Sequence, residues 1–523
     1  MYLRNLQPSN MSVRVRFAPS PTGPLHMGGV RTALYNYLFA RANGGKFLLR
    51  IEDTDRTRYV EGAEEYIIEA LNWCGLTVDE SDNEGGGHGP YKQSLRSELY
   101  EKAVADLLKS GDAYRAFDTP EELNALRKDA ESQKEVFQYD ASTRGACRNE
   151  LAMPAEEVAD LLSNDTPHVI RFRTPDVAED VVFTDEIRGE VCISSGVVDD
   201  KVLMKMDGLP TYHLANVVDD HHMEISHVIR GEEWLPSAPL HILLYRAFNW
   251  DAPQFAHLPL ILKPEGNGKL SKRDGDAGGF PVFPIEWNDP KTGATASGYR
   301  ENGYLPDAFI NMLLMLGWNP GDEREKFTLK EAANCFSLDR IVKSGARFSP
   351  DKAKWFNELY LRDKTHTDLA AELCSMAAEK GRDLSEDDAK RIIGMMLERV
   401  SFLADIFKAN WLFEEPSKDE FNLKMVKKKW KDETASYLEE LSGVLEGIDE
   451  FEAENIETEF KAFLEVKELG FGQVLLPFRI ALTGSGGGPS MFEFAKFLGK
   501  EATLARLKKG IATVAEIKAE LNN

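Results

Sequence analysis

The chain has few cysteines, and their spacing suits neither a set of disulfide bonds nor a metal site. Five cysteines are scattered over 523 residues without close pairing: Cys74, Cys147, Cys192, Cys335 and Cys374. An odd number of dispersed thiols excludes a disulfide framework and a cysteine-rich metal centre. This usage favours a reducing compartment, so we expect a cytoplasmic protein.

Long apolar runs are missing as well. No run of apolar residues approaches the length that a membrane-spanning helix needs. Residues 1–10 lack the apolar core of a signal peptide, and Met11 directly precedes the first predicted strand. We expect residues 1–10 to be an extension, with the functional chain starting at Met11. A chain of this length is expected to hold roughly three to five domains.

Basic residues are scarce relative to acidic ones. Lys and Arg number 63 against 87 Asp and Glu, which gives a formal net charge of −24. Such a balance repels polyanions on average but leaves the local field at a binding track undetermined. A nucleic-acid partner would therefore bind along one confined basic track, and we expect salt to weaken that binding.

The common glycine templates for phosphate binding are also absent, yet a different glycine-rich turn follows the first strand. Residues 12–17 alternate as in a short strand, and residues 30–43 hold good helix formers. The stretch 16–29 between them contains prolines, glycines and His26. Free amides at a helix start bind phosphate, and His26 adds a donor. The pattern favours a nucleotide-binding turn, with a plain strand–loop–helix corner as the alternative.

A second, basic stretch lies well downstream. Lys269-Leu270-Ser271-Lys272-Arg273 offers cations and a hydroxyl to a triphosphate, although such a pentapeptide alone is usually solvated surface. Together with His26-Met27-Gly28-Gly29, it resembles the HIGH and KMSKS signatures of class I aminoacyl-tRNA synthetases. Residues 16–23, 50–55, 210–220 and 228–234 narrow the resemblance to bacterial-type glutamyl-tRNA synthetases, from about residue 12 to the C-terminus.

This resemblance implies an α/β Rossmann-like catalytic domain with an inserted α+β acceptor-binding domain, followed by an all-α C-terminal anticodon-binding region. The pattern agrees, because strand signals almost vanish beyond about residue 327. The expected segments are residues 1–112 and 202–262 for the Rossmann halves, 113–201 for the acceptor-stem insertion, 263–362 for a stem-contact domain, and 363–418 and 419–523 for two helical anticodon-binding subdomains. Residues 274–302 are longer than usual in the family, and we expect an ordered excursion or lid of open role.

The resemblance also assigns the site residues. Charge stabilisation in catalysis falls to His26, Lys269 and Lys272. ATP would be bound by His26, Gly28, Gly29, Glu233, Trp234, Lys269, Leu270 and Lys272. Glutamate would be bound by Arg16, Tyr212 and Arg230 at its γ-carboxylate and by Ser20, Glu52 and Asn216 at its amino-acid backbone.

Two of these assignments have alternatives at the level of the residues. Arg230 follows a strand-like segment and precedes a glycine, where a guanidinium suits bidentate capture of a carboxylate. An ion pair with Glu232 or Glu233 is the alternative. Tyr212 lies in what reads as an alternating strand, which would hide it in the core as readily as in a site. The nearby histidines fall on mixed spacings and are expected to be core or solvated: His213, His221, His222 and His227.

The implied reaction proceeds in two steps. The α-carboxylate of L-glutamate attacks the α-phosphate of ATP, giving glutamyl-adenylate and diphosphate, and the terminal 2′-hydroxyl of tRNA(Glu) then takes the glutamyl group and releases AMP. Mg²⁺ would accompany ATP, and a monomer is the family expectation. Charging of tRNA(Gln) is left open. The rivals are a truncated relative that glutamylates a tRNA base, a silent paralogue acting as a regulator, and a glutaminyl-tRNA synthetase.

No structural zinc is expected in the insertion. Relatives hold zinc through Cys-x-Cys and a later Cys/His pair, but Ala116 and Asp118 occupy the first pair here. Cys147 is the remaining thiol, and one thiolate cannot complete a tetrahedral site.

Two features of the helical region are candidates for RNA contact. Arg399 is a candidate to read an anticodon base, because arginine can grip a base edge bidentately; a surface ion pair is the alternative. A basic patch is predicted on one helical face, either solvated and paired with following acids or in contact with RNA: Lys424, Lys427, Lys428 and Lys431.

Overall fold

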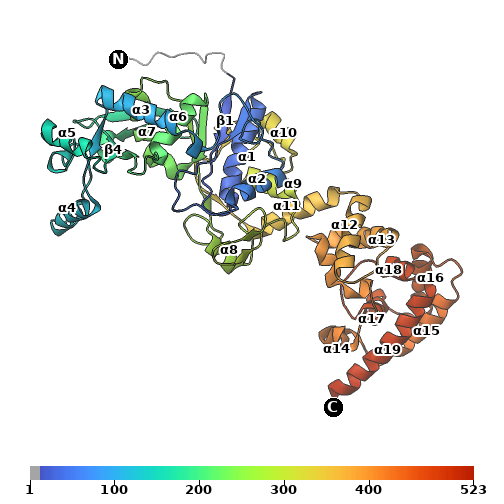
Figure 1. Cartoon of the computed structure of the whole chain (residues 1–523). Coiled ribbons are helices and arrows are strands. Elements are labelled where there is room, and N and C mark those ends of the chain that lie inside the picture. Colours follow the sequence, from blue (N-terminus) through green and yellow to red (C-terminus); the bar gives the residue numbers. More distant parts are fainter. Residues whose placement is uncertain (1–11, 523) are drawn as a thin grey trace. The chain divides into compact units, whose positions relative to one another are not determined.

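The computed structural model describes residues 12–522, so the predicted extension at residues 1–10 lies outside the described residues. The chain divides into two compact units, one ending at Ala353 and the other beginning at Lys354. Strands and helices are mixed in the first unit, while the second is drawn with helices alone (Figure 1). The α/β and all-helical parts of the predicted fold class are thereby confirmed.

The elements of the first unit alternate between strands and helices. Its strands are β1 (Arg14–Phe17), β2 (Lys46–Leu49), β3 (Ala113–Ala116), β4 (Val169–Phe172), β5 (Asp180–Asp185), β6 (Gly189–Ser194), β7 (Val202–Met204), β8 (His227–Gly231), β9 (Gln254–Leu258), β10 (Ile261–Leu262), β11 (Trp287–Asn288), β12 (Thr295–Ala296) and β13 (Ala346–Arg347). Its helices are α1 (Met27–Ala42), α2 (Ala63–Trp73), α3 (Ser97–Ser110), α4 (Pro120–Ser132), α5 (Ala155–Ser163), α6 (Tyr212–His222), α7 (Ala238–Ala247), α8 (Lys272–Gly278), α9 (Pro306–Met315) and α10 (Leu329–Cys335).

Buried parallel strands form the core beneath the site. β1 pairs in parallel with β2, and β9 pairs in parallel with both β8 and β5. The Ser226 amide donates to the Arg14 carbonyl at 2.9 Å, which joins β1 to the segment that enters β8. All of β1 is buried, as expected for parallel strands covered on both faces. Parallel strands place their carboxyl ends at one edge, where α/β folds bind ligands.

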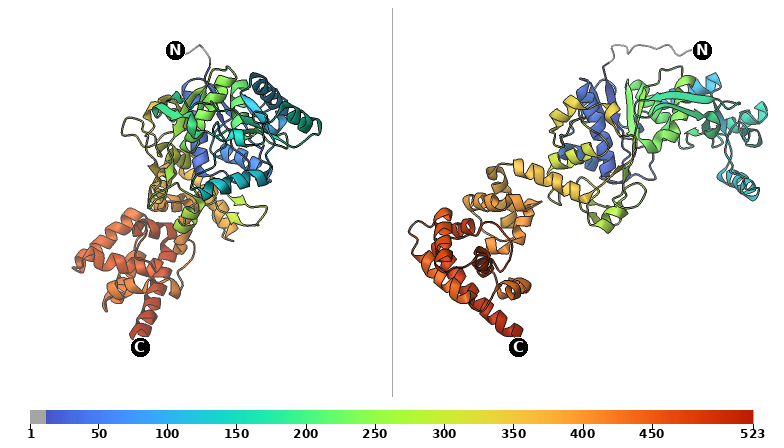
Figure 2. Two further views of the ribbon diagram at one scale, coloured as in Figure 1. Left: turned by 90° about the vertical axis from the view of Figure 1, so that its left-hand side faces the viewer. Right: turned by 180° about the vertical axis from the view of Figure 1, so that it is seen from behind.

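The segment 113–204 contributes to two different sheets. β3, β4 and β7 form a small antiparallel sheet, and α4 and α5 lie with it to one side of the parallel strands (Figure 2). The hairpin of β5 and β6 instead extends the sheet of β8 and β9, since Asp185 is in register with Phe255. This pairing brings Asp185 next to β9, which matters for the site below.

Hydrogen bonds occupy the place where relatives would hold zinc. Asp118 accepts from the Arg148 amide at 2.7 Å and from the Tyr139 hydroxyl at 2.8 Å. The Cys147 thiol donates to the Thr143 carbonyl, and burial raises its pKa to about 11, so it stays protonated. Within residues 12–522 no group of three or more His, Cys, Asp or Glu side chains is placed to bind a metal ion.

Metal analysis of the purified chain should therefore find zinc well below one ion per chain. The protonated Cys147 thiol and the hydrogen-bonded Asp118 offer no tetrahedral ligand set. Inductively coupled plasma mass spectrometry after dialysis without chelator measures this directly. One zinc ion per chain, lost together with fold stability on adding a chelator, would contradict the expectation.

The second unit consists of helices joined by loops, and no strand occurs within residues 354–522. α11 (Pro350–Asp363) spans the boundary between the units. It is followed by α12 (His366–Glu379), α13 (Glu386–Met396), α14 (Leu423–Lys429), α15 (Thr434–Glu446), α16 (Ala453–Val466), α17 (Phe471–Thr483), α18 (Met491–Leu498) and α19 (Lys500–Asn522). α19 packs closely on α17 because Gly510 lies there; a Cβ would stand 2.1 Å from the Ala481 carbonyl oxygen. No helix described by the structure is long and apolar enough to cross a membrane.

The predicted basic patch is smaller than its spacing suggested. α14 ends at Lys429, so Lys431 does not share its face; the Lys431 amide instead donates to the Thr434 hydroxyl at 2.8 Å, at the start of α15. The following acid Asp432 pairs with Lys518 rather than with the patch. In the described part of the chain, none of the four patch lysines forms an ion pair, which leaves their charges available to a polyanion.

Candidate active site

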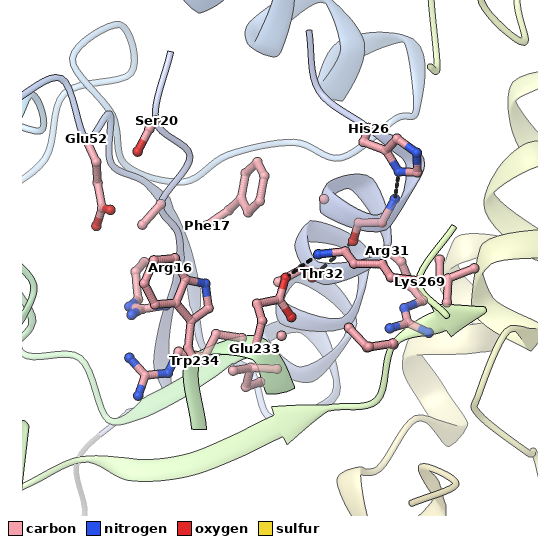
Figure 3. A pocket seen from close by; sticks show the side chains of 18 of the residues that line it. Arg16, Phe17, Ser20, His26, Arg31, Thr32, Glu52, Glu233, Trp234 and Lys269 are labelled. Carbon is pink, nitrogen blue, oxygen red and sulfur yellow. Dashed lines mark hydrogen bonds and ion pairs between the residues drawn. The ribbon is translucent and has the colours of Figure 1, made fainter. Parts of the chain in front are cut away.

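A cavity of about 410 Å³ opens at the carboxyl ends of β1 and β8. Its wall combines the loop after β1, the start of α1, the start of α6 and the segment after β8. Figure 3 shows Arg16 and Glu52 toward one end and His26 and Lys269 toward the other. Nearly all predicted site residues line it: Arg16, Ser20, His26, Gly28, Gly29, Glu52, Tyr212, Asn216, Arg230, Glu233, Trp234, Lys269 and Leu270. Lys272 lines an adjoining cavity that also touches Ser20 and His26.

A network of buried charges forms the end with Arg16 and Glu52. Arg16 donates to both carboxylate oxygens of Asp220, at 2.9 and 3.1 Å. Arg50 donates to Asp220 at 2.7 Å and to Glu52 at 3.1 Å, and the Asn216 amide, turned to satisfy its neighbours, accepts from both arginines. Burial raises the pKa of Glu52, and the Arg50 charge opposes that rise. A ligand ammonium beside Glu52 would stabilise its ionised form.

Arg230 is buried at the same end, and no acidic side chain among the described residues pairs with it. Its Nη1 donates to the Tyr212 hydroxyl at 3.1 Å, and its Nη2 is buried without a hydrogen-bond partner among residues 12–522. The alternative ion pair is not formed, because Glu232 pairs with Arg188 and Glu233 pairs with Lys269. An unpartnered guanidinium nitrogen in a cavity wall is suited to a ligand carboxylate.

The strand predicted around Tyr212 is wrong. Tyr212 is the first residue of α6, and its ring packs against Trp234 with centroids 4.2 Å apart. The sequence held the correct signal: Thr211 precedes apolar residues at helical spacing, Leu214, Val217 and Val218. The short apolar alternation across 212–218 obscured that spacing.

The free amides predicted at the start of α1 are also absent. The Met27 amide donates to the Val282 carbonyl at 2.8 Å, and the Gly28 amide donates to His26 Nδ1 at 3.2 Å. The next two amides donate to the His26 carbonyl. All four amides of the first turn therefore have partners, and phosphate binding here would depend on side chains.

The two glycines after His26 differ in what they allow. A Cβ on Gly29 would lie 2.5 Å from Leu25, so glycine permits a close packing contact there. A Cβ on Gly28 would meet only His26, at 3.6 Å, and would project beside the cavity that Gly28 lines. Gly28 therefore leaves room for a ligand at the helix start.

His26 presents an unused hydrogen-bond donor. Because its Nδ1 accepts from the Gly28 amide, the proton of the neutral ring lies on Nε2. That Nε2 is buried without a partner among the described residues. Burial, and then the Lys269 charge, lower the pKa of His26 to about 4, so the ring is neutral at pH 7. A neutral donor and the Lys269 ammonium thus border the same end of the cavity.

Residues 274–302 form an ordered wall beside the two signature stretches. The Tyr66 hydroxyl of α2 donates to the Ile285 carbonyl at 2.6 Å, in addition to the contact of Val282 with α1. The Phe283 ring meets His26 edge-on at 6.1 Å and lies 6.0 Å from the Lys272 ammonium. Sequence reasoning missed Phe283, because nothing in its neighbours indicates a contact with two residues of the signatures.

Arg399 belongs to the second unit and is not among the residues that line this cavity. It is the last residue of the 3₁₀ turn Leu397–Arg399, which follows α13. The side chain is exposed and, within residues 354–522, forms no ion pair, so the surface salt bridge proposed as an alternative is not formed. Burial lowers the pKa of Arg479, and the nearby charge of Arg399 lowers it further. The neighbouring guanidinium groups of Arg399 and Arg479 make the local electrostatic potential positive.

Comparisons with known proteins agree across nearly the whole chain. The family model described as tRNA synthetases class I (E and Q), catalytic domain, matches residues 12–355, and an anticodon binding domain model matches residues 366–511. A glutamate–tRNA ligase of Christiangramia forsetii is 52% identical over 502 residues, covering 96% of this chain and 99% of the relative. One of Phocaeicola vulgatus is 53% identical over 507 residues, with the same coverage.

Solved structures are similar to the same extent. A crystal structure of a glutamate tRNA ligase from Elizabethkingia meningosepticum, in complex with its amino acid, superposes with a TM-score of 0.93 at 51% identity. A glutamate-tRNA synthetase from Elizabethkingia anophelis superposes with a TM-score of 0.91 at 50% identity. Each superposition covers 96% of this chain and 100% of the solved chain.

Proposed function

Because the chain belongs to the glutamate–tRNA ligases of the class I tRNA synthetase family, we propose that it charges tRNA(Glu) in two steps. The glutamate α-carboxylate attacks the α-phosphate of ATP, which forms glutamyl-adenylate and releases diphosphate. The terminal 2′-hydroxyl of the tRNA then attacks the glutamyl carbonyl and releases AMP. Neither step needs a covalent enzyme intermediate, so positioning and charge stabilisation carry catalysis.

The end of the cavity with Arg16 and Glu52 holds glutamate in this proposal. Glu52 takes the α-ammonium, whose charge offsets the burial of its carboxylate. Arg230 takes the γ-carboxylate with its unpartnered Nη2, supported by Tyr212 and Arg16. Ser20 and Asn216 complete the contacts to the amino-acid backbone. The relative solved with its amino acid supports a built amino-acid site in this family.

The opposite end holds ATP. His26 Nε2–H, Lys269 and Lys272 stabilise the phosphates as charge develops during adenylate formation. Gly28 leaves room at the helix start, and Gly29, Leu270, Glu233 and Trp234 border the nucleotide. Mg²⁺ bound to ATP would supply further positive charge at the diphosphate, beside Lys269 and Lys272.

The remaining parts of the chain contact the tRNA. We assign the acceptor stem to the insertion 113–201 and to the stem-contact segment 263–362, and the anticodon to the helical segments 363–418 and 419–523. The match of residues 366–511 to an anticodon binding domain supports the last assignment. Arg399, exposed and unpaired within residues 354–522, is our candidate for reading an anticodon base.

One observation carries the proposal: the Arg230 side chain, whose Nη2 has no partner among residues 12–522, and the buried Glu52 carboxylate line the same cavity as His26 and Lys269. The truncated rival lacks the helical unit that this chain has, and a glutaminyl-tRNA synthetase would carry β-barrels there. A silent paralogue would not keep the phosphate-facing donors.

Parallel charging assays test the function. The purified chain should attach radiolabelled glutamate to tRNA(Glu) in an ATP-dependent reaction that releases AMP. Charging of tRNA(Glu) alone establishes a discriminating enzyme and keeps Arg399 as a specificity residue. Charging of tRNA(Gln) as well keeps the enzyme but removes that role from Arg399. Failure with both tRNAs would reject catalysis and leave the silent paralogue.

A further inference from the structure

Three neutral side chains hold the guanidinium of Arg230. Nε donates to His257 Nε2 at 3.1 Å, and Nη1 donates to Tyr212 and lies 3.1 Å from His241 Nδ1. Arg230 and both histidines are buried, and His257 has no exposed surface at all. The Nη2 group alone remains without a partner among residues 12–522. The guanidinium is therefore fixed in orientation on every side except one.

The hydrogen bonds determine which nitrogen of each imidazole carries its proton. Asp185 lies 2.6 Å from His257 Nδ1, and a carboxylate only accepts, so Nδ1 carries the proton and Nε2 is free to accept from Arg230. Asp185 is itself fixed by the backbone amides of Ile187 and Arg188. In this hydrogen-bonded series, Arg230 donates to His257 and His257 donates to Asp185.

The second imidazole follows the same logic. Arg230 has only donors, so His241 Nδ1 accepts and its Nε2 carries the proton. That Nε2 lies 3.2 Å from His213 Nδ1, which accepts in turn. Burial, followed by the Arg230 charge, holds the pKa of His241 well below its usual range. Burial also lowers the pKa of His257 and of His213, in the latter case to about 4. All three rings are neutral at pH 7.

A buried arginine is usually paired with a carboxylate, and both Arg16 in the cavity wall and the buried Arg50 behind Glu52 are paired in this way. Arg230 differs, because no carboxylate pairs with it in the described part of the chain. A carboxylate at either histidine position would neutralise the guanidinium and compete with an anionic ligand. Neutral acceptors hold the group without cancelling its charge.

We infer that His257 and His241 are positioning residues that hold Arg230 with Nη2 free and with no carboxylate of residues 12–522 bonded directly to it, so that the cavity selects an acidic side chain over its amide. This inference rests on the proposed assignment of Arg230 to the γ-carboxylate of glutamate. A substrate carboxylate supplies the missing charge, whereas a neutral amide would leave the buried guanidinium unpaired.

Matched substitutions of His241 distinguish the hydrogen bond that it accepts from Arg230 from the packing of its side chain. His241→Asn places an amide oxygen near the position of Nδ1, while His241→Leu has the same branching and no acceptor. In tRNA(Glu) charging, His241→Leu should raise the KM for glutamate about tenfold, because a hydrogen bond to a charged group is lost. The KM for ATP should stay within about twofold of the unchanged chain, since no ATP contact is altered. His241→Asn should restore most of the affinity for glutamate.

A second pair tests the other imidazole and guards against misfolding. His257→Gln keeps an acceptor for Arg230 Nε, and His257→Met removes it with an unbranched chain of similar length. Thermal melting identifies any variant that does not fold. If one pair of variants is lost in this way, the KM values of the other pair test the inference. The inference is overturned if the apolar variants keep the glutamate KM of the unchanged chain, or if apolar and amide variants lose glutamate and ATP affinity alike. If the unchanged chain itself charges no tRNA, the proposed function fails instead.

Discussion

Arg230→Ala should raise the KM for glutamate about 100-fold, because a buried, charge-assisted contact to the γ-carboxylate is lost. The KM for ATP should change little, since Arg230 lies at the opposite end of the cavity from His26 and Lys269. Steady-state charging of tRNA(Glu) with each substrate varied in turn measures both constants. The ratio of the two effects distinguishes a glutamate contact from general damage to the cavity.

Arg230→Lys provides the control. A lysine keeps the charge but has neither the planar fork nor the Nε donor that bonds His257. It should recover only part of the affinity for glutamate. Equal increases in the KM for glutamate and for ATP in Arg230→Ala would contradict the assignment of Arg230 to the amino acid. The same variant should also discriminate less between glutamate and glutamine, because the guanidinium charge is gone.

The resemblance to paired signatures, rather than a local sequence pattern, predicted that the two signature stretches meet. His26 and Lys269 are separated by more than 240 positions, yet both line one cavity, as their resemblance to paired signatures implied. The predicted helices and strands of the α/β unit occur close to their expected positions because apolar periodicity is a local property. The strand predicted at Tyr212 failed where a short alternation concealed a helix start.

Contacts between segments far apart in the sequence could not be predicted from local sequence patterns. The Met27 amide is occupied by the carbonyl of Val282, and no local pattern at either position indicates this bond. Asp185 and His257 meet only because β5 joins the sheet beside β9. The partners of Arg230 likewise come from different elements. That no carboxylate among residues 12–522 bonds to it directly is therefore a property of the fold rather than of the residues flanking it.

His26→Asn should lower the rate of adenylate formation about 10²- to 10³-fold, because one donor to a developing phosphate charge is lost. Asparagine is a good N-cap, so its side-chain oxygen can still accept from the Gly28 amide and retain the start of α1. His26→Ala should lose the same activity and also about 1 kcal/mol of stability through the missing cap. Glutamate-dependent pyrophosphate exchange with tRNA present, together with thermal melting, separates the two losses.

The protonation state of His26 gives a further discriminating outcome. Its pKa is lowered to about 4, so the ring is neutral above that pH and donates from Nε2 without titrating between pH 6 and 8. The unchanged chain and His26→Asn should therefore show pH–rate profiles of the same shape across this range, offset by a constant factor. A step near pH 6.5 in the unchanged chain alone would mean that His26 acts as a cation, and retention of the full rate by His26→Asn would show that its Nε2 donor has no part in catalysis.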